Sequence, residues 1–172
     1  MIIDSDWLSR GTEKVAFELV GCNLCIQIAG KTQKHLITET EAYIGEDDLA
    51  CHASKGRTPR TEVMYGPPGY WYVYLCYGIH HLLNIVTEKE GFPAAVLIRG
   101  IHSCSGPGRL TKALSINMEY NKKGAMQENG LWLETSTPLP SKCIHSYPRI
   151  GVDYAGPIWS KKPFRFIFEP TD

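Results

Sequence analysis

The chain has 172 residues and a mass of 19.3 kDa, enough for one domain with a hydrophobic core and short for two. Hydrophobic residues make up 43% and charged residues 21%, which argues against disordered and fibrous architectures. No apolar run approaches the roughly 20 residues of a membrane-spanning helix. The first residues also lack the cationic and then apolar layout of a secretory leader. We therefore expect a cytoplasmic protein with no membrane partner.

The charge is balanced overall but unevenly distributed. Lys and Arg number 18, as do Asp and Glu, so no net charge favours a generic polyanion binder. Residues 1–94 carry 8 basic and 12 acidic side chains, whereas residues 95–168 carry 10 basic and 4 acidic ones. A basic face could be built mainly from Arg99, Arg109, Lys112, Lys122, Lys123, Arg149, Lys161, Lys162 and Arg165. The alternative is a scatter of solvated charges.

The cysteines are spread widely: Cys22, Cys25, Cys51, Cys76, Cys104 and Cys143. Because no leader is evident, reduced thiols are the better interpretation. Cys22 and Cys25 have CxxC spacing, but no second such pair exists, and residues three apart on a strand point to opposite faces. We therefore expect ordinary half-buried thiols and no metal site.

The first predicted element is a helix over residues 12–20, which has Thr12 at its start, one apolar face and Gly21 as a stop. Strands are predicted over 24–29, 36–44, 70–76, 80–87 and 94–99, a second helix over 109–116, and the last strands near 131–134 and 164–168. Short links between consecutive strands favour antiparallel pairing. The predicted fold class is therefore α+β.

The strand over 36–44 alternates with period two and places Glu39, Glu41 and Tyr43 on one face. Residues 45–53 follow, an acidic turn leading into a helical start that carries His52. We interpret Glu46 to Asp48 as the N-terminal turn of a helix with solvated acids.

The strand over 70–76 places one set of aromatic rings, Tyr70, Tyr72 and Tyr74, on the same side. Such a strand can be plain core or a platform on which a ligand stacks. Tyr77-Gly78 interrupts the pattern before the next strand, which predicts that Tyr77 lies at or near a hairpin tip. An aromatic residue there has no core to fill and is suited to insertion into a partner.

The apolar strand over 94–98 is followed by Arg99. An arginine in this position is expected to be partly buried and to need an anionic partner. Glu41, also on a strand with apolar neighbours, is a plausible partner. Spacing alone favours a stabilising ion pair without a catalytic role.

Several motifs occur in order through nearly the whole chain: Glu39-Thr40-Glu41-Ala42-Tyr43, Asp48 to His52, Arg57-Thr58-Pro59-Arg60, Tyr72-Val73-Tyr74 with Tyr77-Gly78, Asn84, Val96-Leu97-Ile98-Arg99, Ser105-Gly106-Pro107 and Pro148-Arg149-Ile150-Gly151. Together they resemble the alkyladenine (3-methyladenine, methylpurine) DNA glycosylase family, and agreement of so many ordered motifs makes the resemblance specific. It implies one DNA glycosylase domain over residues 1–172, with a mixed, mostly antiparallel curved sheet and short flanking helices, like the C-terminal domain of formyltransferases. It also implies a monomer that acts on double-stranded DNA containing damaged purines, in the cytoplasm or at the nucleoid of a bacterium, without a cofactor.

The resemblance assigns roles by matching position. Glu41 matches the general base that activates water to attack C1′ of the target nucleotide, and Arg99 matches the arginine that helps to hold that water. Tyr43, His52 and Tyr74 match the groups that stack on the extruded base.

Three further positions match the family. Tyr77 matches the tyrosine that fills the gap left in the duplex. Asn84 matches a residue at the pocket floor whose side chain crowds the exocyclic amine of guanine, and Ile150 matches a backbone carbonyl near the water.

The implied reaction is monofunctional hydrolysis of the N-glycosidic bond of alkylated or deaminated purines. Arg99 beside Glu41 should favour its ionised form, which suits a base. His52 is a candidate proton donor because histidine titrates near neutral pH, although stacking or hydrogen bonding is the more conservative role. No motif indicates a lysine nucleophile, so no strand cleavage is expected.

The sequence departs from the family in two places. Only residues 100–104 separate Arg99 from Ser105-Gly106-Pro107, where relatives carry a longer segment, and the chain begins close to its first helix. Both departures are expected to weaken DNA binding. Because the net charge is also near zero, DNA affinity would rest on local contacts, with these candidates: Arg57, Arg60, Arg109, Lys112 and Arg149.

Two other functions compete with the glycosylase hypothesis. A DNA-binding module without catalysis would keep the hairpin tip, but it would not need Glu41 and Arg99. A zinc hydrolase or nucleobase deaminase would use Cys22, Cys25, Cys51 and His52, but the chain lacks the H-x-E and P-C-x-x-C pattern of such deaminases.

Overall fold

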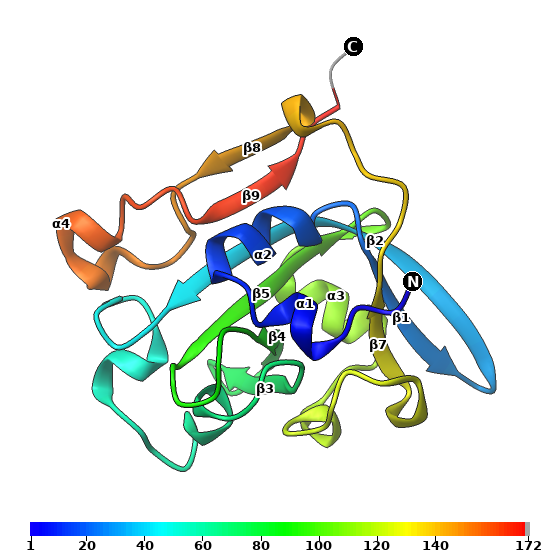
Figure 1. Cartoon of the computed structure of the whole chain (residues 1–172), viewed down its shortest axis with the longest axis horizontal. Coiled ribbons are helices and arrows are strands. Elements are labelled where there is room, and N and C mark those ends of the chain that lie inside the picture. Colours follow the sequence, from blue (N-terminus) through cyan, green and yellow to red (C-terminus); the bar gives the residue numbers. More distant parts are fainter. Residues whose placement is uncertain (171–172) are drawn as a thin grey trace.

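The computed structural model describes residues 1–170. Its helices are α1 (Ser5–Leu8), α2 (Thr12–Leu19), α3 (Pro107–Ala113) and α4 (Gly156–Trp159), and its strands are β1 (Asn23–Ile28), β2 (Lys31–Ile44), β3 (Trp71–Cys76), β4 (His80–Val86), β5 (Ala94–Ile101), β6 (Cys104–Ser105), β7 (Leu131–Glu134), β8 (Ile144–Tyr147) and β9 (Arg165–Phe168). The strands form one curled sheet with the order β3-β4-β5-β2-β1-β7 (Figure 1). The predicted α+β class is confirmed.

The sheet is antiparallel at every pairing in residues 1–170. β6 pairs with β5 as a tight hairpin, and β9 joins β2 and carries β8 on its other side. α2 lies across β2 and β5, while α3 packs on β4 and β5 (Figure 1). Two segments that are far apart in sequence, the end of β2 and the loop after β8, are thereby brought near one another.

The predicted helix over 12–20 is confirmed as α2. Its apolar face, including Val15 and Leu19, is fully buried in the main core. The backbone N–H of Thr12 donates to Glu88 Oε1 at 2.8 Å, which satisfies one of the free donors at the helix start. Gly21 ends the helix with a φ of 96°, a conformation that costs other residues more than glycine.

All the predicted strands are present, with small differences at their ends. β2 begins at Lys31, five residues before the predicted start, because its pairing with β1 extends it through exposed residues that carry no hydrophobic alternation. Four elements were not predicted from the pattern of residues: α1, β6, β8 and α4, which are two to four residues long. Periodicity needs a longer window to be recognised.

Cys22, Cys25, Cys51, Cys76 and Cys104 are free thiols. Cys22 is buried in the main core, where burial raises the pKa of its thiol to about 11. Within residues 1–170, no group of three or more His, Cys, Asp or Glu side chains could hold a metal ion. The same residues contain no helix long and apolar enough to span a membrane.

Candidate active site

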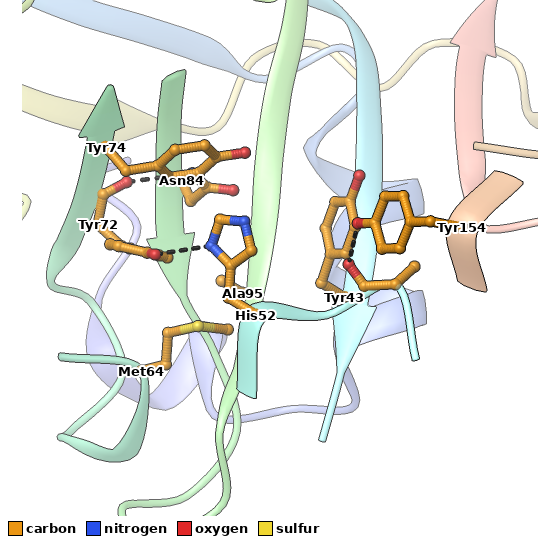
Figure 2. A pocket seen from close by; sticks show the side chains of 9 residues that line it. Tyr43, His52, Met64, Tyr72, Tyr74, Asn84, Ala95 and Tyr154 are labelled. Carbon is orange, nitrogen blue, oxygen red and sulfur yellow. Dashed lines mark hydrogen bonds between the residues drawn. The ribbon is translucent and has the colours of Figure 1, made fainter. Parts of the chain in front are cut away.

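The eight residues singled out by the resemblance line two neighbouring hollows. A groove of about 780 Å³ is lined by most of them: Glu41, Tyr43, His52, Tyr74, Tyr77, Arg99 and Ile150. A smaller cavity of about 40 Å³ shares Tyr43, His52 and Tyr74 with the groove and has Asn84 in its wall (Figure 2). The fold therefore gathers residues from β2, β3, β4, β5 and three loops in one place.

Glu41 is fully buried and is held by three donors. Its Oε1 accepts hydrogen bonds from the Tyr43 hydroxyl at 2.9 Å and from Arg99 Nη1 at 3.3 Å. Its Oε2 accepts one from the backbone N–H of Ile150 at 2.7 Å. The predicted Arg99–Glu41 ion pair is thus confirmed.

A second carboxylate, Glu39, belongs to this cluster and was assigned no role from the sequence. Glu39 Oε1 accepts from Arg99 Nε at 3.2 Å and from Arg165 Nη1 at 3.1 Å. The period-two pattern that placed Glu39 and Glu41 on one face carried this signal. The pattern does not show that β9 pairs with β2 and brings Arg165 close to Glu39.

A β-bulge sets the position of Arg99. In the pairing of β2 with β5, Thr40 lies opposite Ile98 and Glu39 opposite Gly100, so Arg99 is the extra residue between them. A bulge re-aims the side chain of the extra residue. Gly100 fits the crowded bulge, since a Cβ there would lie 3.2 Å from the Cβ of Glu39.

Burial raises the pKa of Glu41, and this is the largest influence on it. Arg99, the Ile150 N–H and the Tyr43 hydroxyl each lower the pKa, whereas Glu39 raises it. The expectation that Arg99 favours the ionised form of Glu41 is confirmed, but desolvation is the larger effect, so the net shift of the pKa is upward. Removal of the carboxylate from water outweighs the one partly shared arginine.

The aromatic alternation predicted for β3 is confirmed. Tyr72 and Tyr74 turn to the cavity, whereas Trp71 and Val73 on the opposite face belong to the main core. The ring of His52 lies 4.6 Å from that of Tyr74, and its Nδ1 is 2.8 Å from the Tyr72 hydroxyl (Figure 2). β3 therefore contributes to the core and to the cavity at once.

Tyr154 is a cavity residue that sequence reasoning missed. It lies beside Tyr43 on the side of the cavity away from β3, and its hydroxyl donates to the carbonyl of Ala50 at 3.0 Å (Figure 2). It is placed by a short 3-10 turn at 153–155. A single tyrosine outside any periodic segment gives no local signal of this position.

His52 is neutral near pH 7. Burial, together with the nearby charges of Arg60 and Lys55, lowers its pKa to about 4. An imidazole with this pKa carries almost no proton to donate at neutral pH, so the geometry favours a stacking or hydrogen-bonding role.

Asn84, Ile150 and Tyr77 occupy distinct places around the site. Asn84 is buried on β4, and its Nδ2 donates to the Tyr72 carbonyl at 3.2 Å. Ile150 meets Glu41 through its N–H, while its side chain is 51% exposed. Tyr77 lies in the turn between β3 and β4 with a φ of 51° and is 93% exposed, which confirms the hairpin-tip prediction.

The predictions for Asp48 and Arg149 are wrong. Asp48 was expected in a solvated helix turn and Arg149 on a basic surface, but both side chains are fully buried and form a bidentate ion pair. The distances are 2.6 Å from Arg149 Nη1 to Asp48 Oδ2 and 2.9 Å from Nη2 to Oδ1. Local sequence shows charges but not the partner that makes their burial possible.

The proposed basic face also loses other members. Arg99 and Arg165 point to Glu39, so neither is a free surface cation. The remaining expected DNA contacts near the groove include Arg60 and Arg109, which both line it.

Comparisons with known proteins agree with this geometry. The model of the family described as "Methylpurine-DNA glycosylase (MPG)" matches residues 6–104 and 102–171. The two stretches overlap at residues 102–104, in the tight hairpin between β5 and β6.

Three relatives bear the name "Putative 3-methyladenine DNA glycosylase". A protein of Myxococcus xanthus is 49% identical over 172 residues, covering 95% of this chain and 88% of that protein. One of Rickettsia felis is 50% identical and covers 88% of this chain and 86% of its own length. One of an Anaeromyxobacter species is 42% identical and covers 98% and 90%.

The fold, the site and these matches define an enzyme of the DNA glycosylase class, whose substrate is DNA. The chain belongs to the methylpurine-DNA glycosylase family.

Proposed function

We propose that this glycosylase rotates an alkylated purine out of the duplex into the aromatic cavity and hydrolyses its N-glycosidic bond with a water activated by Glu41. The observation that carries the proposal is the buried Glu41 carboxylate, fixed by three donors in the groove beside the aromatic cavity. A base in a duplex stack cannot reach such a site without being extruded.

Tyr77 supports the extrusion step. Its exposed ring projects from the hairpin tip on the rim of the groove, where it can occupy the gap left in the duplex. Filling the gap offsets part of the unstacking cost of a few kcal/mol.

The rings of Tyr43, His52 and Tyr74 would stack on the extruded base. A purine alkylated at N3 or N7 is cationic, so it gains cation–π attraction on these rings and leaves without being protonated first. His52, with its lowered pKa, is a poor proton donor, which favours these lesions over neutral ones. The relatives' names, which specify 3-methyladenine, point to the same class.

Glu41 suits the role of general base. Its raised pKa makes the ionised carboxylate a stronger base, and its negative charge would stabilise the cationic sugar that develops as the bond breaks. Oε2 accepts one hydrogen bond, from the Ile150 N–H, so its second lone pair remains available for a water at the groove. The Ile150 carbonyl and Arg99 are the proposed partners of that water.

The reaction should end without strand cleavage. No lysine lines the groove or the cavity among the described residues, so neither supplies an amine that could form a Schiff base with the sugar. Trapping with borohydride is the direct check: a covalent protein–DNA adduct would overturn this part of the proposal.

The central experiment measures release of free base from duplexes with a single 3-methyladenine-type or hypoxanthine lesion, comparing wild type with Glu41→Gln. We expect the variant to lose at least about a thousandfold in single-turnover rate while it retains lesion binding. Binding without release by the wild type would instead indicate a DNA-binding module.

A further inference from the structure

The Asp48–Arg149 pair lies behind the cavity, outside the set of residues that the reaction requires. Besides Asp48, the Arg149 guanidinium donates from Nη1 to the carbonyl of Ala42 at 2.9 Å and from Nη2 to that of Trp159 at 3.2 Å. It thereby ties β2, the turn after β2 and the end of α4 together.

Arg149 also touches two parts of the catalytic site. Its guanidinium carbon lies 4.8 Å from the centre of the Tyr43 ring, a cation–π contact that holds this ring from behind. The next residue in the chain is Ile150, whose N–H donates to Glu41 Oε2 at 2.7 Å. Displacement of Arg149 must therefore displace a direct partner of Glu41.

Asp48, the partner of Arg149, also binds the backbone of the turn after β2. Its Oδ2 accepts from the N–H of Ile44 and its Oδ1 from that of Ala50, each at 3.0 Å. These bonds fix the turn that leads to His52, and the carbonyl of Ala50 receives the Tyr154 hydroxyl. The cavity wall formed by Tyr43 and Tyr154, and the turn that leads to His52, thus depend on one buried ion pair.

We propose that Arg149 is a positioning residue: its pair with Asp48 sets the Ile150 N–H on Glu41 and the Tyr43 ring against the cavity. The inference rests on the proposed function, because it assigns a purpose to the geometry of Glu41. A lysine cannot replace Arg149, since a single ammonium cannot reach two carboxylate oxygens and two carbonyls in one plane.

The pKa of the Glu41 carboxyl reports whether Arg149 holds the Ile150 N–H in place. The groups that act on it are Arg99 from β5, Tyr43 and Glu39 from β2, and the Ile150 N–H from the loop after β8. Arg165 from β9 acts through Glu39. Arg149→Lys keeps the positive charge, so a change in the pKa of Glu41 would report the lost Ile150 hydrogen bond.

The test is the Glu41 pKa, measured by carbon NMR of glutamate-labelled protein without DNA, for wild type and Arg149→Lys. We expect the pKa to rise by about one unit in the variant, because a hydrogen bond to the ionised form is lost. The matched control is Arg10→Lys, which perturbs the ion pair between Arg10, in the loop before α2, and Glu18 on α2, and should leave the pKa of Glu41 unchanged. An unchanged pKa in folded Arg149→Lys would overturn the proposal.

Activity gives a second measurement. Single-turnover base release by Arg149→Lys should fall about 10- to 100-fold at neutral pH, with lesion affinity within about threefold, and the deficit should shrink at higher pH. If wild type releases no base, the proposed function fails while the NMR result still decides the role of Arg149. If Arg149→Lys does not fold, Asp48→Glu carries the same test, since it keeps the charges of the pair and changes its geometry.

Discussion

Two arginine–carboxylate clusters lie next to each other at the site, and they differ in burial and in the lengths of their contacts. The closed cluster, Asp48 and Arg149, has no exposed side-chain surface and short contacts of 2.6 and 2.9 Å. The open cluster, formed by Glu39, Glu41, Arg99 and Arg165, has contacts of 3.1 to 3.3 Å between side chains and borders the groove.

The difference distinguishes an ion pair that stabilises the fold from a cluster that can bind a ligand. In the closed cluster both carboxylate oxygens and both terminal guanidinium nitrogens are engaged, so the geometry is fixed. In the open cluster one arginine is divided between two carboxylates, and the 12% exposed Arg99 side chain can still take up a water or a substrate atom. A site that binds a water or a substrate needs polar atoms whose hydrogen-bonding capacity is not already filled by protein groups.

The largest expected effect is on stability. Arg149→Met leaves the Asp48 carboxylate buried without a cation and should lower the free energy of unfolding by about 3–5 kcal/mol. Arg99→Met, the matched change in the open cluster, should cost about 1 kcal/mol, because Glu39 and Glu41 can protonate or meet water. Urea unfolding followed by circular dichroism compares the two. Equal losses of unfolding free energy in the two variants would contradict the difference proposed between the clusters.

The next effect is on the pH dependence of base release. Arg99 lowers the pKa of Glu41, so Arg99→Gln should raise it and move the acidic limb of the single-turnover rate to higher pH. At neutral pH the rate should fall about 10- to 100-fold, and part of the loss should be recovered on raising the pH. A loss that is independent of pH would show that Arg99 acts through geometry alone.

A smaller effect should be a gain in stability. The pKa of Glu41 in the folded protein lies above its ordinary value of 4.5, so the native state binds more protons than the unfolded chain between the two values. Stability therefore falls as the pH rises through this window. Glu41→Gln should unfold at higher urea than wild type at pH 7, and the difference should vanish below about pH 4. A less stable variant at pH 7 would contradict this sign.

The smallest effect is expected at Glu39. Its charge raises the pKa of Glu41, so Glu39→Gln should move the acidic limb slightly to lower pH and change the neutral rate by less than about threefold. The same pH–rate series measures it. A loss as large as that of Arg99→Gln would mean that Glu39 is needed to aim the arginine.

Much of the fold and the site could be predicted from local pattern. Period-two alternation placed Glu41 and Tyr43 on one face of β2, and the break at Tyr77-Gly78 located the hairpin tip. The apolar strand before Arg99 indicated an anionic partner, which Glu41 supplies. These features are fixed by neighbours within a few residues, so they can be read along the chain.

The remaining features come from contacts between distant segments. Asp48 and Arg149 are 101 residues apart, and only the packing of the loop after β8 against the turn after β2 makes a buried pair of two residues that look solvated. The same burial turns the net pKa shift of Glu41 upward despite Arg99. Which side chains share a strand face follows from alternation along the chain. Which of them lose contact with water depends on segments far apart in sequence, because desolvation depends on everything packed around a charge.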